Sequence, residues 1–159
     1  MIDQAPVYLE NLHSMPVESS DLAEAAREFA GTLAFIAGTP PEIDLVHLGL
    51  GPHGHTASLA PGDPVNQVTD RDVALTGVYQ GRRRMTLMFP AITRTRRVLR
   101  LLTGAEKAEM LARLRKADAS IPAGRVRRDR AVIGVIVRLS RERERGIGSR
   151  QSIPYFTIK

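Results

Sequence analysis

The sequence of 159 residues contains no cysteine and no tryptophan, and only 4% of its residues are aromatic. The absence of cysteine excludes disulfides, thiolate catalysis and cysteine-based zinc sites. Because 43% of the residues are hydrophobic, the chain can form one domain with an aliphatic core. No apolar run approaches the ~20 residues of a membrane helix, and residues 1–4 do not resemble the start of a signal peptide. We therefore expect a cytoplasmic protein without membrane contact.

Basic residues are nearly missing from the first half of the chain. Residues 1–81 carry 11 acidic and 2 basic side chains, whereas residues 82–159 carry 6 acidic and 21 basic ones. Such asymmetry can indicate nucleic-acid binding. However, 20 of the 23 basic residues are arginine, as a GC-rich genome would also produce, and no aromatic residues interleave with them to stack on bases. We do not expect nucleic-acid binding, and a basic interaction module stays an alternative that salt-dependent binding to polyanions would reveal.

Strand and helix patterns alternate between Ser19 and Val137. This alternation predicts an α/β fold with a mostly parallel sheet and helices on both faces. We expect a single domain over residues 1–137, followed by a charged, exposed and disordered extension over residues 138–159. The predicted helices cover residues 19–37, with Ser19 or Ser20 as N-cap, 91–97 and 104–116. The predicted strands cover residues 43–48, 73–78, 98–103 and 131–137, and a further apolar strand lies within residues 82–90, where Pro90 stops it.

The most informative stretch covers residues 49–62 and reads G-L-G-P-H-G-H-T-A-S-L-A-P-G. It follows a short buried strand, and open α/β sheets bind ligands at the carboxyl ends of their strands. The glycines allow backbone N–H groups to approach an anion, and Thr56 is expected to cap a short helix that begins at residues 57–59. His55 lies in the middle of this turn. Its imidazole, with an ordinary pKa of about 6.5, can take a proton from water near neutral pH.

This stretch closely resembles the G-M-G-x-D-G-H-T-A-S-L-F-P signature of the 6-phosphogluconolactonase family, part of the glucosamine/galactosamine-6-phosphate isomerase superfamily. The letters T-A-S-L at residues 56–59 separate it from the sister glucosamine-6-phosphate isomerases, whose loop reads G-H-I-A-F-N-E. Two positions differ from the signature: His53 replaces an acidic residue and Ala60 replaces the usual phenylalanine. The resemblance covers roughly residues 2–129. The family's N-terminal G-G-x-T-P and G-D-E-R motifs occur nowhere in the sequence.

The resemblance implies a Rossmann-like three-layer fold, truncated at its N-terminus, and a carboxylic-ester hydrolase of the oxidative pentose phosphate pathway. Its substrate would be 6-phosphoglucono-1,5-lactone, hydrolysed without a metal or cofactor. By this resemblance His55 is the general base, and N–H groups near Gly51 and Gly54 stabilise the oxyanion. Arg84 matches the arginine of the family's R-V-T-L-T-L-P segment, which faces the substrate. Lys107, in Gly-Ala-Glu-Lys, matches a lysine that contacts the substrate phosphate.

Four features leave alternatives open. An imidazole at His53 cannot supply the fixed negative charge of the family's acidic residue, so we treat His53 as a modulator of His55. The two histidines have a spacing that can chelate a metal, but no nearby Asp or Glu completes a ligand set, and we expect no metal. The missing motifs leave open a non-catalytic remnant that binds sugar phosphate weakly or not at all. The missing strands would leave a sheet face or edge uncovered, which predicts marginal stability or a homo-oligomer.

Overall fold

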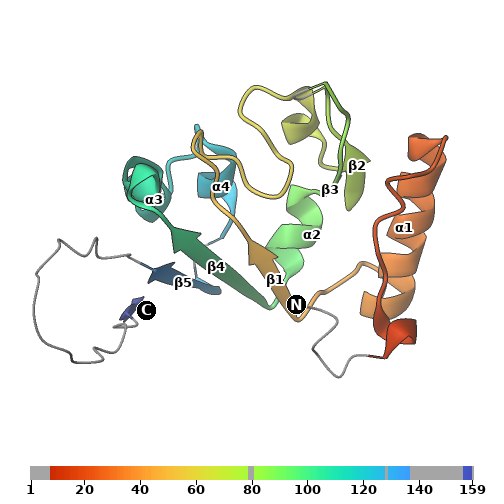
Figure 1. Cartoon of the computed structure of the whole chain (residues 1–159). Helices are drawn as coiled ribbons and strands as arrows, with labels where there is room; N and C mark the ends of the chain where they lie inside the picture. The colour runs from red at the N-terminus through yellow and green to blue at the C-terminus, as the bar shows by residue number, and fades with distance from the viewer. Residues whose placement is uncertain (1–7, 79–80, 128, 137–155, 159) are drawn as a thin grey trace, which may run out of the picture.

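The chain folds around a four-stranded sheet with strand order β1-β4-β5-β6 (Figure 1). The computed structural model describes residues 8–78, 81–127, 129–136 and 156–158. Strands β1, β4 and β5 are parallel, and β6 pairs antiparallel with β5. The predicted α/β class with a mostly parallel sheet is confirmed. The strands are β1 (Leu45–Leu48), β4 (Arg97–Thr103), β5 (Ala131–Ile136) and β6 (Phe156–Ile158).

The last strand corrects one expectation about the C-terminal extension. Residues 138–155 lie outside the described residues, but Phe156–Ile158 pairs with β5 as β6. The expectation of an extension without regular structure is therefore wrong at its end, where the β-branched and aromatic side chains favour a strand. The domain boundary at residue 137 stays a prediction.

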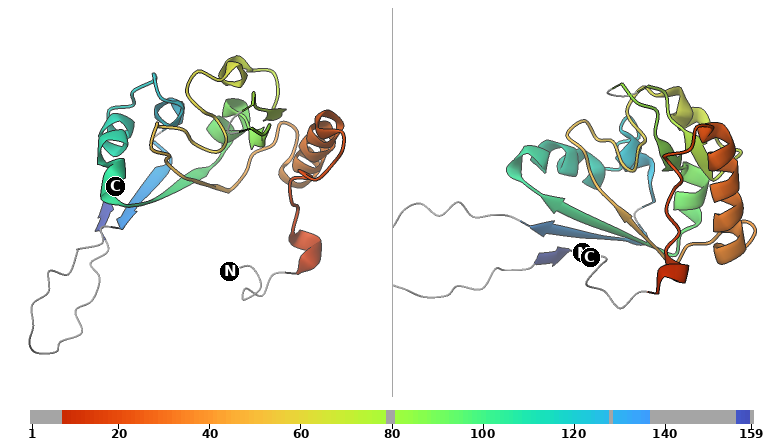
Figure 2. Two further views of the ribbon diagram at one scale, coloured as in Figure 1. Left: turned by 45° about the horizontal axis from the view of Figure 1, so that its top comes forward. Right: turned by 45° about the vertical axis from the view of Figure 1, so that its right-hand side comes forward.

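A second, two-stranded antiparallel sheet lies beside the main sheet. It consists of β2 (Val73–Leu75) and β3 (Met85–Leu87), both of which the sequence predicts as strands. The long helix α1 (Leu22–Ala37) packs against this small sheet, where Ala25 and Ala26 share an apolar cluster with buried residues of β2 and β3 (Figures 1 and 2). The apolar stripe of α1 therefore covers the small sheet and not the main one.

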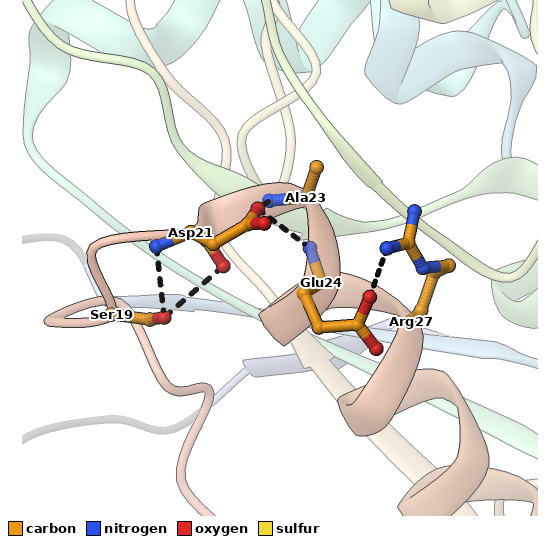
Figure 3. A network of polar contacts seen from close by, with 5 residues as sticks. All are labelled: Ser19, Asp21, Ala23, Glu24 and Arg27. Atoms are coloured by element: carbon orange, nitrogen blue, oxygen red, sulfur yellow. Dashed lines mark hydrogen bonds and ion pairs between the residues drawn. The ribbon is translucent and has the colours of Figure 1, made fainter.

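Helix α1 begins with an aspartate cap (Figure 3). The Asp21 carboxylate accepts hydrogen bonds from the backbone N–H groups of Ala23 and Glu24, each at 3.0 Å. The prediction that Ser19 or Ser20 caps the helix is wrong. Asp21 stands immediately before the first helical residue, and its charge also suits the positive end of the helix dipole. The Ser19 hydroxyl instead donates to the Asp21 carbonyl oxygen.

The shorter helices lie over one face of the main sheet (Figures 1 and 2). Alternate side chains of β4 point to this face: Val98 packs in the cluster that includes buried residues of α2, and Leu102 packs in the cluster beneath α3 and α4. The helices are α2 (Phe89–Arg94), α3 (Ala108–Arg115) and α4 (Pro122–Arg125), and the 3₁₀ turns are η2 (Leu9–Asn11), η3 (Pro64–Gln67) and η4 (Ala105–Lys107). None of the described helices is long and apolar enough to cross a membrane.

The opposite face of the main sheet carries exposed apolar side chains. Leu45 is 54% exposed, Leu101 is 45% exposed and Val132 is 47% exposed. The sequence predicts helices on both faces of the sheet, and the missing strands predict an uncovered sheet face or edge. Among the described residues, the exposed side chains on this face match the prediction of an uncovered face.

Candidate functional site

The glycine-rich loop leaves β1 at the carboxyl end of the sheet and closes on itself. The N–H of Gly51 donates to the carbonyl oxygen of His55 at 2.9 Å, and the N–H of Gly54 donates to the carbonyl oxygen of Gly51 at 3.0 Å. These two N–H groups hold the turn together. Each is already used within the loop, so the prediction that N–H groups near Gly51 and Gly54 stabilise an oxyanion concerns other N–H groups of the loop and stays a prediction.

Thr56 also has a different role from the predicted one. No helix begins at residues 57–59; Thr56 and Leu59 instead form an isolated antiparallel bridge, with Ala57 at a positive φ of 49° between them. The Thr56 hydroxyl donates to the carbonyl oxygen of Gly49 at 2.9 Å. Its side chain is 1% exposed, so it fastens the end of the loop to its beginning.

The glycines at 51 and 54 are required by close contacts. A Cβ atom on Gly51 would lie 1.8 Å from Cε1 of His55, so the imidazole ring lies directly over this glycine. Gly54 has φ +77°, and a Cβ atom there would lie 2.6 Å from the Cβ of Ile121. The N–H of Ala123 in α4 donates to the carbonyl oxygen of Gly54 at 3.0 Å. Any larger residue would displace the ring at the first position and the approach to α4 at the second.

The surroundings of His55 favour the neutral form of its imidazole. Partial burial lowers the pKa of His55, and the electrostatic effects of His53, Arg84 and Lys107 lower it further. A protonated imidazole cannot accept a proton. Because a lowered pKa favours the neutral ring, it preserves the basic form of His55 at pH 7. The same electrostatic coupling shows that the fold brings all four predicted side chains into one neighbourhood.

Each of these side chains comes from a different place in the fold. His53 is exposed on the loop itself, and Lys107 is half-buried at the end of η4, after the turn that follows β4. Arg84 is exposed just before β3. Its backbone is paired with buried Thr76: the Arg84 N–H donates to the threonine hydroxyl at 3.0 Å, and the Arg84 carbonyl oxygen accepts the threonine N–H at 2.9 Å.

This arrangement suits proton abstraction beside an anion. A neutral imidazole can deprotonate water, while the permanent cations Arg84 and Lys107 attract a phosphate or a developing oxyanion. Among the residues that the structure describes, no group of three or more His, Asp or Glu side chains could hold a metal ion. A cavity of about 740 Å³ lies elsewhere, between α1 and β2, and none of the four site residues lines it.

One residue near the site escapes the sequence analysis. Arg100 on β4 is 1% exposed, and its Nη2 donates to the carbonyl oxygen of Ala123 at 3.1 Å. The only signal in the sequence is a charged residue inside the apolar run 98–102. A residue such as Arg100, which interrupts the apolar pattern of a strand, is a candidate for a functional role.

Comparison with known proteins identifies the family. Residues 1–134 match the family described as glucosamine-6-phosphate isomerases/6-phosphogluconolactonase. The chain belongs to this family. The match extends five residues beyond the end of the resemblance seen in the sequence, into β5.

Several individual members are similar to this chain. A 6-phosphogluconolactonase from Synechocystis is 37% identical over 122 residues, which are 74% of this chain and 50% of the relative. One from Rattus norvegicus is 37% identical over 118 residues, 71% of this chain and 44% of the relative. The crystal structure of 6-phosphogluconolactonase from Thermotoga maritima superposes with a TM-score of 0.70 at 27% identity, over 86% of this chain and 60% of that one. The chain thus spans about half the length of the curated relatives it matches.

Proposed function

We propose that this chain hydrolyses 6-phosphoglucono-1,5-lactone to 6-phosphogluconate. The observation that carries the proposal is the half-buried imidazole of His55, whose pKa is lowered by burial and by the nearby charges of Arg84 and Lys107. His55 takes a proton from water as the water oxygen attacks the lactone carbonyl carbon. When the tetrahedral intermediate collapses, the carbon–oxygen bond of the ring breaks and the imidazolium returns the proton to the ring oxygen. No cofactor takes part.

The two cations, Arg84 and Lys107, each serve both substrate binding and charge stabilisation. Arg84 and Lys107 hold the phosphate, and their positive field also favours the negative charge that develops on the carbonyl oxygen. The N–H groups of Gly51 and Gly54 donate hydrogen bonds within the loop. These two glycines therefore contribute by positioning the His55 ring. His53 modulates His55 through its electrostatic effect. The proposed substrate is a small cytoplasmic sugar phosphate.

A non-catalytic remnant is the second candidate function. It is favoured by His53, which stands where the family signature has an acidic residue, and by the exposed apolar face of the main sheet. A remnant would bind 6-phosphogluconate weakly or not at all and would not turn over the lactone. Binding to polyanions that weakens with salt, without turnover, would instead support a basic interaction module.

A lactonase assay of the purified chain separates these candidates. Turnover must exceed the spontaneous hydrolysis of the lactone, and His55→Ala should lose about 10² to 10⁴-fold of the enzymatic rate if it is the general base. His47→Ala is the matched control, since His47 is an exposed histidine on β1. Equal rates for wild type and His55→Ala above background would overturn the proposal in favour of the remnant.

Ligand binding tests the cations separately from catalysis. Calorimetry should show that 6-phosphogluconate binds more tightly than gluconate, and that Arg84→Ala and Lys107→Ala each remove much of this difference, roughly tenfold or more. Arg82→Ala, which removes an exposed arginine two residues from Arg84, is the control. Equal affinity for the two sugars would contradict a phosphate site at these residues.

A further inference from the structure

Strand β4 carries an arginine in the apolar interior. Arg100 lies between Val98 and Leu102 on the covered face of the sheet, and these neighbours belong to the two separate apolar clusters. Its side chain is 1% exposed. Nη2 donates to the carbonyl oxygen of Ala123, whereas Nη1 is buried without a hydrogen-bond partner among the described residues. Burial lowers the pKa of Arg100 to about 10.

This charge does not serve the stability of the core. A buried guanidinium loses its hydration, and no carboxylate within the described part of the chain forms an ion pair with Arg100 in return. An apolar side chain of similar size would fill the same space without this cost. The hydrogen bond to the Ala123 carbonyl oxygen is a role that an apolar side chain could not fill.

That carbonyl group begins a continuous chain of hydrogen bonds to the site. Arg100 donates to the Ala123 carbonyl oxygen at 3.1 Å, and the Ala123 N–H donates to the Gly54 carbonyl oxygen at 3.0 Å. The Gly54 N–H donates to Gly51, and the Gly51 N–H donates to His55. Gly51 is also the residue on which the imidazole ring rests. Every link between the core of the sheet and the proposed base is thus a short contact.

We propose that Arg100 is a positioning residue for His55. By holding α4 through the Ala123 carbonyl group, it keeps the N–H of Ala123 on Gly54 and the loop closed beneath the imidazole ring. Its catalytic consequence rests on the proposed lactonase function, whereas its effect on the loop does not. Because proton transfer depends on the placement of the base, a small displacement of the ring reduces the rate strongly.

The substitution Arg100→Met tests the proposal. It fills the space and removes the guanidinium, so thermal stability should equal or exceed that of wild type. The Ala123 amide hydrogen should exchange about tenfold faster. In an NMR titration the pKa of His55 should rise towards the ordinary value, since the ring becomes more hydrated while His53, Arg84 and Lys107 still face it. In the active protein kcat should fall roughly ten- to a hundredfold with KM nearly unchanged.

Two further variants make the result specific. Arg100→Lys keeps a donor and should restore part of the Ala123 protection and of kcat. Arg94→Met is the control, because the Nε of Arg94 likewise donates to a backbone carbonyl oxygen, that of Pro41, at 3.1 Å; unlike Arg100, Arg94 also forms an ion pair with Asp72. It should lower stability and leave the His55 titration and Ala123 exchange unchanged.

The possible outcomes separate this inference from the proposed function. An unchanged His55 pKa and unchanged Ala123 exchange in Arg100→Met would overturn the inference, as would equal shifts in Arg94→Met. Failure of Arg100→Met to fold would also overturn it, because the guanidinium would then be needed for the core. A wild-type chain without lactonase activity would overturn the proposed function alone, since the NMR and exchange measurements require no turnover.

Discussion

His55 can act as a base only while its imidazole is neutral, so activity should depend on pH through this residue. The pKa of His55 is lowered by burial and by the electrostatic effects of His53, Arg84 and Lys107. As the pH falls through that value, the ring becomes protonated and kcat/KM should fall. The acid limb of the pH–rate profile should therefore lie below the ordinary histidine value of about 6.5.

The same profile carries an internal control. Arg84→Ala removes one of the charges that lower the pKa of His55, so the acid limb should move to higher pH. Arg82→Ala, at the neighbouring exposed arginine, should leave the limb in place. An acid limb that does not respond to Arg84→Ala would assign the titration to another group.

His53 is the second residue whose replacement is informative. Its electrostatic effect lowers the pKa of His55, whereas the acidic residue that the family carries at this position would stabilise the imidazolium that forms during the reaction. His53→Asp should therefore raise kcat. His53→Asn, which has a similar shape without the charge, separates the electrostatic effect from the loss of the imidazole. A rate for His53→Asp that does not exceed that of His53→Asn would show that no carboxylate is needed there.

At the scale of the loop, substitutions at two glycines test whether activity depends on the position of the His55 imidazole. Gly51→Ala places a methyl group where the His55 ring lies, 1.8 Å from its Cε1, so the ring must move and kcat should fall by about 10²-fold. A Cβ atom at Gly49 would meet nothing within 4 Å, and its φ does not require glycine. Gly49→Ala should therefore keep near-wild-type activity and melting temperature. Equal activity of the two variants would mean that the ring position is unimportant.

Some secondary-structure elements could be predicted from the sequence, whereas the hydrogen bonds within the loop could not. Strand β1, helix α1 and strand β4 follow from apolar periodicity, because burial on one face imposes it. The gathering of His55, Arg84 and Lys107 follows from the motifs, although their roles stay predictions. The use of the Gly51 N–H within the loop and the bond from Thr56 to Gly49 could not be predicted, since both depend on the path of the backbone through the turn.

Two further features depend on tertiary structure. The strands β2 and β3 carry ordinary strand patterns, which do not say that they form a sheet apart from β1 and β4. The depth of Arg100 is likewise set by what α4 places above β4. A long side chain on a strand is compatible with the surface until the covering elements are known.

At the scale of the whole molecule, the uncovered face of the main sheet should govern behaviour in solution. Leu45, Leu101 and Val132 are 54%, 45% and 47% exposed on this face. Strand β1 is also an edge strand, with no further partner among the described residues. Exposed apolar faces and open strand edges both favour association, because burial of apolar surface and pairing of backbone groups lower the free energy.

The chain should therefore form oligomers, or bind a hydrophobic dye such as ANS in its native state. Light scattering over a range of concentrations and dye fluorescence would measure both effects. Leu101→Lys places a charge on the uncovered face and should reduce association and dye binding with little loss of stability, since Leu101 is already 45% exposed. Ala112→Lys, at an exposed position of α3, is the control and should change neither. A monomer without dye binding would show that this face is covered by other parts of the chain.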